Sequence, residues 1–120
     1  MILADTSVWV DHLRNGNRKL YKLLMMNEVC THEFIYGELL CGNIKNSSDF
    51  FENLLQLPFL QTVQHSETIY LLKMHQLSGR GIGWIDVHLI ASSYLYDAKI
   101  FTLDKKLHVI ANELNILYTE

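Results

Sequence analysis

Residues 1–14, MILADTSVWVDHLR, contain the stretch on which the fold depends. Met1–Ala4 is a short apolar run without a polar face, which is typical of a parallel strand buried on both sides. The run ends at Asp5, and Thr6 and Ser7 then offer hydroxyl groups that can begin a helix. Ligands of open α/β sheets bind just beyond the carboxyl ends of the strands, where this pattern places Asp5. An isolated Asp at such a point is also a common turn or capping residue, so Asp5 alone leaves both roles open.

The composition indicates one globular domain over residues 1–120. The chain is long enough for one hydrophobic core but not for two, and 49% hydrophobic with 19% charged residues excludes disorder. No apolar run approaches the roughly 20 residues that span a bilayer, and early acidic residues interrupt any signal peptide. We therefore expect a cytoplasmic protein without membrane contact. Cys30 and Cys41 are expected to be reduced and buried.

The net charge of −3 comes from 13 acidic and 10 basic side chains and does not resemble the basic surface of most nucleic-acid-binding proteins. If four of the acids gathered in one pocket, however, nine acidic and ten basic side chains would remain elsewhere. The outer surface would then be close to neutral. Net charge therefore does not exclude a nucleic-acid partner.

Strand and helix patterns alternate along the chain. Strands are predicted at residues 1–4, 29–31, 59–63 and 99–103, with a short further one at 116–118. Helices are predicted at residues 8–14, 18–26, 32–41, 47–56, 68–77, 87–96 and 104–114. Such alternation favours a parallel sheet covered on both faces with right-handed crossovers. The expected fold class is α/β, a three-layer α/β/α sandwich with a central parallel sheet of four to five strands.

Four carboxylates occupy positions that this fold would bring together. Asp5 and Asp104 directly follow apolar strands and precede helices, and Asp86 follows a glycine-rich joint at the start of another helix. Glu38 lies inside the helix that follows the second strand. If the first, second and fourth strands are parallel neighbours, their carboxyl ends meet at one edge of the sheet. Asp5 and Asp104 would then face each other across a crevice, with the other two acids reaching in from helices.

Such a cluster of acids carries a large electrostatic cost. Two carboxylates about 6 Å apart repel by roughly 3 kcal/mol at an effective dielectric constant near 20. A fold stable by about 5 to 15 kcal/mol therefore needs either protonated acids or a bound cation. Carboxylate oxygens without His or Cys favour Mg²⁺ or Mn²⁺. A cation with open water positions can activate water for phosphodiester hydrolysis.

Four segments around these acids resemble a known family. They read DTSVWVDHLR at 5–14, GELL at 37–40, GIGWIDVHLIA at 81–91 and TLDKKL at 102–107. In this order they resemble PIN-domain ribonucleases and, more narrowly, the VapC toxins of bacterial type II toxin–antitoxin pairs. The resemblance extends over nearly the whole chain.

The resemblance implies roles for individual residues. All four acids would be catalytic and would bind Mg²⁺ or Mn²⁺, with Asp5 and Asp86 closest to the metal. Ser7 and Thr102 match small hydroxyl residues that hydrogen-bond within the site. The family cuts single-stranded or loop RNA, commonly tRNA or rRNA, and so inhibits translation. It further implies a homodimer and a VapB-like antitoxin whose tail covers the acidic pocket.

Basic residues near the acids are candidates for RNA contact. Lys105 follows Asp104, and Arg80 lies in the glycine-rich joint, from where either could contact a phosphate. A second basic group near the chain start is either a solvated face or a grip on the RNA backbone: Arg14, Arg18, Lys19 and Lys22.

Several other features are interpreted as structural. His88 lies about 200° around its helix from Asp86, so a non-catalytic position is expected. The glycines of 79–83 do not follow the first strand of a βαβ unit, which argues against a dinucleotide loop. Surface positions are expected for Asp11, Asp97 and Glu113. Side chains expected either in the core or along a groove for the antitoxin or second subunit are Trp9, Leu13, Phe34 and Tyr36.

Two other functions remain open from the sequence. A PIN fold without catalytic activity could serve as an RNA-binding or assembly module. A receiver-type phospho-acceptor domain also gathers acids at strand ends, but it needs a lysine opposite them. Lys99, which precedes its strand, is badly placed for that role.

Overall fold

The computed structural model describes residues 1–45 and 47–120. Their elements are, in chain order, β1 (Ile2–Ala4), α1 (Thr6–Asn15), α2 (Arg18–Met25), β2 (Val29–Cys30), α3 (Glu33–Cys41), α4 (Ser48–Leu54), α5 (His65–Met74), α6 (Trp84–Leu95), β3 (Lys99–Phe101) and α7 (Lys105–Glu113). None of the helices among these described residues has the length and apolar character needed to cross a membrane.

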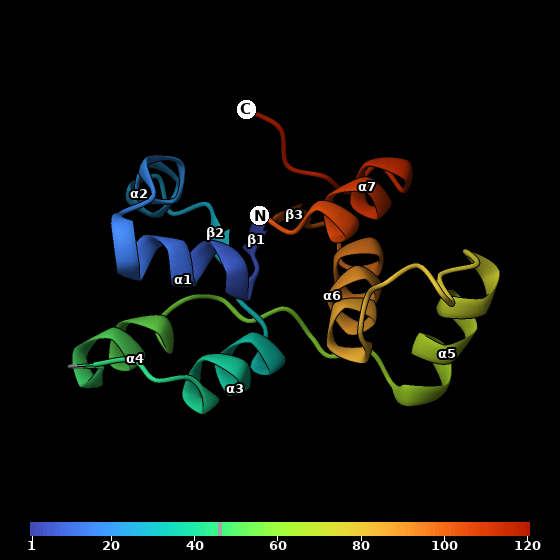
Figure 1. The fold of residues 1–120 in the computed structure, drawn as a ribbon, viewed down its shortest axis with the longest axis horizontal. Coiled ribbons are helices and arrows are strands. Elements are labelled where there is room, and N and C mark those ends of the chain that lie inside the picture. Colours follow the sequence, from blue (N-terminus) through green and yellow to red (C-terminus); the bar gives the residue numbers. More distant parts are fainter. Residues whose placement is uncertain (46) are drawn as a thin grey trace.

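The strands form a parallel sheet in the order β2-β1-β3, so the first strand of the chain is the central one (Figure 1). Leu3 of β1 pairs with Cys30 on one side and with Ile100 on the other. This arrangement confirms the α/β class and the expected neighbours of the first strand. It brings the carboxyl ends of all three strands to one edge.

The expected strand count of four to five is too high for the described residues, which form three strands. Residues 59–63 and 116–118 instead make single parallel bridges, Thr31 with Phe59 and Ile100 with Leu117, at the two outer edges. β2 has two residues, and the segment around Phe59 makes only two backbone hydrogen bonds with Thr31, the residue after β2. The two segments thus lie beside the sheet without extending into strands.

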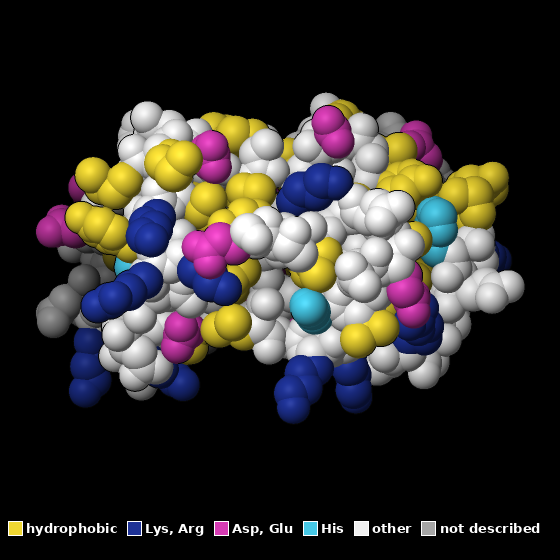
Figure 2. Space-filling model, turned by 90° about the horizontal axis from the view of Figure 1, so that it is seen from above, with side chains coloured by type: hydrophobic (Ala, Val, Ile, Leu, Met, Phe, Trp, Pro, Cys, Tyr) yellow, Lys and Arg dark blue, Asp and Glu magenta, His cyan; other side chains and the backbone are white. Residues whose placement is uncertain are grey.

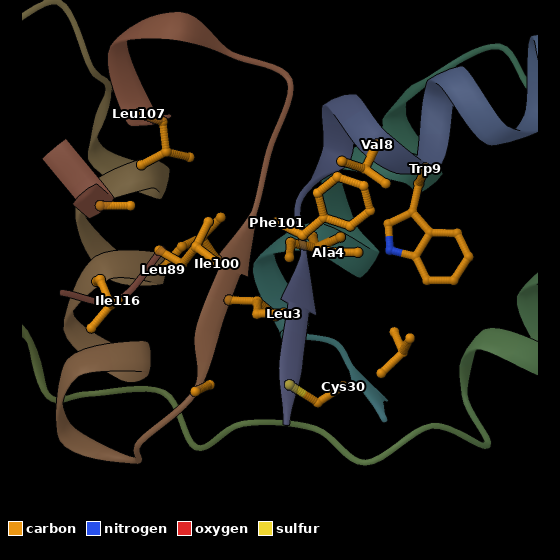
Figure 3. Close-up of a cluster of buried hydrophobic side chains, with 14 of the residues drawn as sticks. Leu3, Ala4, Val8, Trp9, Cys30, Leu89, Ile100, Phe101, Leu107 and Ile116 are labelled. Atoms are coloured by element: carbon orange, nitrogen blue, oxygen red, sulfur yellow. The ribbon is translucent and has the colours of Figure 1, made fainter. Parts of the chain in front are cut away.

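Helices cover both faces of the sheet. Figure 1 shows α1 and α2 on one side of the strands and α6 and α7 on the other, which confirms the three-layer arrangement. Figure 3 shows the core between these layers, where Leu3 and Ala4 point toward side chains of both neighbouring layers. Leu3 and Ala4 of β1 are fully buried, as the apolar sequence predicts, and Ile2 is partly buried.

Among the described helices, four begin at side chains that accept backbone hydrogen bonds, and Asn17 is that residue for α2. Asp5 accepts from the N–H of Val8 at the start of α1, and Asp104 caps α7 in the same way. His32 accepts from the N–H of Phe34 through Nδ1 at 3.0 Å and so begins α3. Burial lowers the pKa of His32 to about 4, so its ring stays neutral and keeps this acceptor.

Some expected boundaries and burials are wrong. α1 begins at Thr6, because Asp5 itself provides the cap that was assigned to the following hydroxyls. α6 begins at Trp84, three residues before the expected start, which places Asp86 inside its first turn. Cys30 is buried as expected, whereas Cys41 is exposed because it ends α3 on the outward side.

Candidate metal and catalytic site

Asp5 is the most enclosed of the four acids, with 5% of its surface exposed. Its backbone N–H donates to the carbonyl of Phe101, which fixes it at the end of β1 beside β3. The hydroxyl of Ser7 donates to Oδ1 and that of Thr102 donates to Oδ2, both at 2.5 Å. Burial raises the pKa of Asp5, while these hydrogen bonds and that of Val8 oppose the rise. The carboxylate is therefore held in one orientation from both sides.

The two hydroxyls also hold the turn between β3 and α7. Ser7 Oγ accepts from the backbone N–H of Leu103, and Thr102 Oγ1 accepts from that of Asp104, each at 3.0 Å. One small network thus connects Asp5 with the residues that begin α7. The hydrogen bonds expected for Ser7 and Thr102 are present.

Asp104 lies at the start of α7. Its Oδ1 accepts from the backbone N–H groups of Lys106 and Leu107, both at 2.9 Å. Its negative charge contributes to the raised pKa of Asp5, after the larger effect of burial. The two acids that follow β1 and β3 therefore interact across the edge of the sheet.

The negative charges of the three other acids all act on the pKa of Asp86. Its pKa is raised to about 6, first by burial and then by the negative charges of Asp5, Asp104 and Glu38, against a hydrogen bond from the backbone of Gly83. Like charges raise a carboxyl pKa only when they lie near it. The four acids thus share one electrostatic environment, as the expected topology requires.

Glu38 approaches from α3 and is exposed. Its Oε1 accepts from the hydroxyl of Thr6 at 2.7 Å, which joins α3 to the first turn of α1. Thr6 is predicted from the sequence only as a residue that helps to begin the helix, and its contact with Glu38 is not predicted. The sequence feature that could have indicated this contact is a threonine directly after Asp5.

The donor set fits a hard divalent cation, since it offers carboxylate oxygens and hydroxyls without His or Cys. Across residues 1–45 and 47–120, no group of three or more His, Cys, Asp or Glu side chains is placed so that it could hold a metal ion. The carboxylates instead turn to their own hydrogen-bond donors, as Asp104 does to α7 and Glu38 to Thr6. Burial and, to a smaller extent, the negative charges of the other three acids nevertheless raise the pKa of Asp86 to about 6.

The two predicted RNA-contacting residues lie in different surroundings. Lys105 is exposed and adjoins Asp104 at the start of α7. Arg80 makes a two-point ion pair with Glu113, at 2.7 and 3.0 Å, near the other end of α7. Its guanidinium is thus already engaged away from Asp104, and RNA contact by either residue stays a prediction.

Two hollows adjoin Glu38. One, of about 490 Å³, lies between α3 and the start of α6 and is lined by Glu33, Phe34, Gly37, Glu38, Cys41, Trp84 and Ile85. The other, of about 480 Å³, lies between α1 and α3 and includes Leu13 and Arg14 in its lining. Phe34 and Leu13, which were expected either in the core or along a groove, each line one of these hollows. Trp9 is in the core.

Comparisons with known proteins agree with this geometry. The family model described as PIN domain matches residues 2–113. Ribonuclease VapC32 of Mycobacterium tuberculosis, found in two strains, is 37% identical over 124 residues, covering 100% of this chain and 98% of the relative. The crystal structure of PAE2754 from Pyrobaculum aerophilum covers 95% of this chain and 94% of its own, with a TM-score of 0.62 and 12% identity, which shows the shared fold. A receiver-type domain is thereby excluded, and the chain belongs to the PIN-domain family of VapC ribonucleases.

Proposed function

We propose that this chain is the toxin of a type II toxin–antitoxin pair, an endoribonuclease that uses Mg²⁺ or Mn²⁺ to hydrolyse RNA phosphodiester bonds. Its targets would be tRNA or rRNA, so that cleavage inhibits translation in the cytoplasm. The observation that carries the proposal is the position of Asp5 and Asp104 after neighbouring parallel strands, where their charges and that of Glu38 also act on Asp86. Likeness to a curated ribonuclease over the whole chain supports the same activity.

Each acid has a proposed part in this reaction. Asp5 and Asp86 would be the principal metal ligands, with Glu38 and Asp104 completing the site and orienting water. When bound, the cation supplies an activated water and neutralises charge on the phosphate. Ser7 and Thr102 keep both oxygens of Asp5 in place. Asp86 carries its negative charge above about pH 6, so the site binds cations best at neutral pH.

RNA binding would depend on local contacts. The face seen in Figure 2 has Lys and Arg side chains interspersed with Asp and Glu, in keeping with the net charge of −3. Lys105 beside Asp104 is therefore our first candidate for a phosphate contact, and binding would weaken as salt increases.

Replacing Asp5 with Asn tests the proposed chemistry. Asn retains the size of the side chain and its ability to cap α1, but loses the charge that binds a cation. We expect Asp5→Asn to abolish Mn²⁺-dependent cleavage of total tRNA and growth arrest while circular dichroism stays unchanged. Asp97→Asn is the matched control, because Asp97 is exposed and its φ of 55° also suits Asn. Wild-type cleavage by Asp5→Asn would refute the assignment.

The family likeness also supports two partners, a VapB-like antitoxin and a second copy of this chain. The hollow between α1 and α3 offers apolar walls from Val10, Leu13 and Ile44 beside the cations of Arg14 and Lys45. An extended antitoxin segment with apolar and acidic side chains would fit it. Sedimentation of the isolated chain tests the homodimer, and loss of antitoxin inhibition in Leu13→Asp tests the groove.

The second candidate is a PIN fold without catalytic activity. It is favoured because no group of three or more His, Cys, Asp or Glu among the described residues is placed to hold a metal ion. Titration calorimetry with Mn²⁺ separates the two. Binding at micromolar to millimolar Mn²⁺ that disappears in Asp5→Asn supports the nuclease, whereas no heat at millimolar Mn²⁺ supports the module.

A further inference from the structure

The hollow between α3 and α6 is walled by one large exposed aromatic side chain. Trp84 has 39% of its surface exposed, although an indole ring usually gains much from burial. Phe34 and Ile85 add apolar surface, and the hollow measures about 490 Å³. A planar apolar group of the size of a nucleobase fits such a space.

Trp84 is held in place by other rings. The imidazole of His88 packs against it in a T-shaped arrangement at 4.7 Å between ring centres, and His65 packs at 5.3 Å. His88 is itself buried and packs against Phe34 at 4.8 Å. The two imidazole rings thus restrict the indole, so ordering it on binding a ligand costs little conformational entropy.

The hollow shares one residue with the acidic group. Glu38 lines the hollow, and its Oε1 accepts from the hydroxyl of Thr6, which directly follows Asp5. Trp84 lies two residues before Asp86 in α6, about 200° around the helix and on the side of His88, so the hollow reaches the acids by way of Glu38. A nucleotide whose phosphate lies at the acids would therefore have its own or its neighbour's base at the entrance to the hollow.

The charge of the lining selects for a base over a phosphate. Glu33 and Glu38 are the charged residues of the lining, which in the described part of the chain contains neither Lys nor Arg. Carboxylates repel phosphate but accept hydrogen bonds from the exocyclic amino groups of cytosine, adenine and guanine. Uracil has no such amino group.

We propose that this hollow is a nucleobase subsite, in which Trp84 stacks on one unpaired, amino-bearing base next to the phosphate that is cleaved. The inference rests on the proposed ribonuclease activity and deepens it. It assigns recognition of one nucleotide to Trp84 and Glu33, residues outside the four acids. Stacking on an aromatic side chain requires an unstacked base, so the substrate would be single-stranded at this position.

Tryptophan fluorescence tests binding without catalysis. The chain has two tryptophans, and Trp9 is 3% exposed, so a change on adding RNA reports on Trp84. We expect a single-stranded RNA of mixed sequence to quench the emission of Asp5→Asn. The quenching should be absent from Asp5→Asn combined with Trp84→Phe. An unquenched indole at saturating RNA would overturn the proposal.

Abasic substitution tests the same contact in wild-type enzyme. In a short RNA cut at one site, the base next to the cut is removed, one position at a time. We expect one abasic position to lower kcat/KM about tenfold or more, as loss of a stacked base does. Uracil at that position should also be cut more slowly than cytosine, and Glu33→Gln should reduce this difference. Equal kcat/KM for every abasic substrate would contradict the subsite.

Trp84→Ala links the residue to the base. This variant should lose about as much kcat/KM as the abasic substrate does, through KM, and combining the two changes should cost nothing further. Tyr70→Ala is the matched control, because Tyr70 is an exposed aromatic on α5. If Trp84→Ala cleaves at the wild-type rate while Asp5→Asn is inactive, the subsite is wrong and the nuclease assignment stands. If wild-type enzyme cleaves no RNA, the nuclease assignment fails, whereas the fluorescence result still decides the subsite.

Discussion

At the scale of single residues, the orientation of Asp5 depends on two hydroxyls. Ser7 donates to Asp5 and accepts from Leu103, so it connects the acid with the turn before α7. Ser7→Ala removes that donor and leaves the N–H of Leu103 without this acceptor. We expect a loss of about 1 to 2 kcal/mol in the free energy of unfolding and about tenfold or more in cleavage rate. Urea unfolding and single-turnover cleavage measure the two effects.

The control for Ser7→Ala is Ser78→Ala. Ser78 is exposed in the turn after α5, so its hydroxyl can be lost without effect on the acids. A Ser7→Ala variant as stable and as active as Ser78→Ala would show that the hydroxyl does not position Asp5.

The raised pKa of Asp86 predicts a pH dependence of stability in chelator-treated protein. The folded chain holds a proton at Asp86 up to about pH 6, whereas an unfolded Asp releases it near 3.8. The proton therefore stabilises the fold below about pH 4, and this contribution is lost as the pH rises through 6. Because Asp86 is partly exposed, we expect an effect of about 1 kcal/mol.

Urea midpoints at pH 5 and pH 7 measure the effect of Asp86. Asp86→Asn should reduce the difference between the two midpoints and raise the one at pH 7. The Mn²⁺ affinity of the wild-type protein should fall below pH 6, because the proton and the cation compete for the same carboxylate. An identical pH dependence in Asp86→Asn would show that other groups cause it.

At the scale of elements, Asp104 begins α7 and also belongs to the acidic group. The two roles separate by substitution, since Asn caps a helix about as well as Asp while Ala does not. Asp104→Ala should lower the free energy of unfolding by about 1 kcal/mol, and Asp104→Asn by much less. Both should lower Mn²⁺-dependent cleavage. If Asp104→Asn cleaves at the wild-type rate, Asp104 is a capping residue alone.

Most elements could be predicted from hydrophobic patterns, but their ends could not. The pattern of apolar residues does not reveal that Asp5 caps α1, since Asp, Thr and Ser are all good capping residues. The segment 59–63 has the composition of a strand. It makes only one bridge, at Phe59, because β2 beside it has just two residues, and the sequence of 59–63 does not reveal how long β2 is. Trp84 was missed because one apolar residue before an acid carries no periodic signal.

At the scale of the whole molecule, a bound cation should stabilise the fold. Under the proposed function, a divalent metal would relieve the repulsion among the four acids, and a ligand at 100 times its Kd adds about 2.7 kcal/mol to the free energy of unfolding. We therefore expect Mn²⁺ to raise Tm by several degrees in wild-type protein and in Asp97→Asn. Asp5→Asn should show little change. Differential scanning fluorimetry measures it, and an equal rise in all three proteins would indicate nonspecific binding.

The proximity of Asp5 and Asp104 could be predicted because it follows from strand order, whereas Glu38 and Asp86 lie on helices whose placement strand order does not determine. Once β1 lies between β2 and β3, residues at the ends of these strands must meet. The hydrogen bonds of Ser7, Thr102 and Thr6 depend on side-chain placement, which the order of elements does not determine. The roles assigned to the four acids remain predictions that the variants above test.

The central position of β1 also has a consequence for synthesis of the chain. Asp5 leaves the ribosome 97 residues before its partner Thr102. Until β3 has emerged, the nascent polypeptide has neither the second edge of the sheet nor the hydroxyl that holds Oδ2 of Asp5. Asp5 and Asp104 are therefore brought together only after β3 has emerged, and we expect a product truncated before β3 to lack ribonuclease activity.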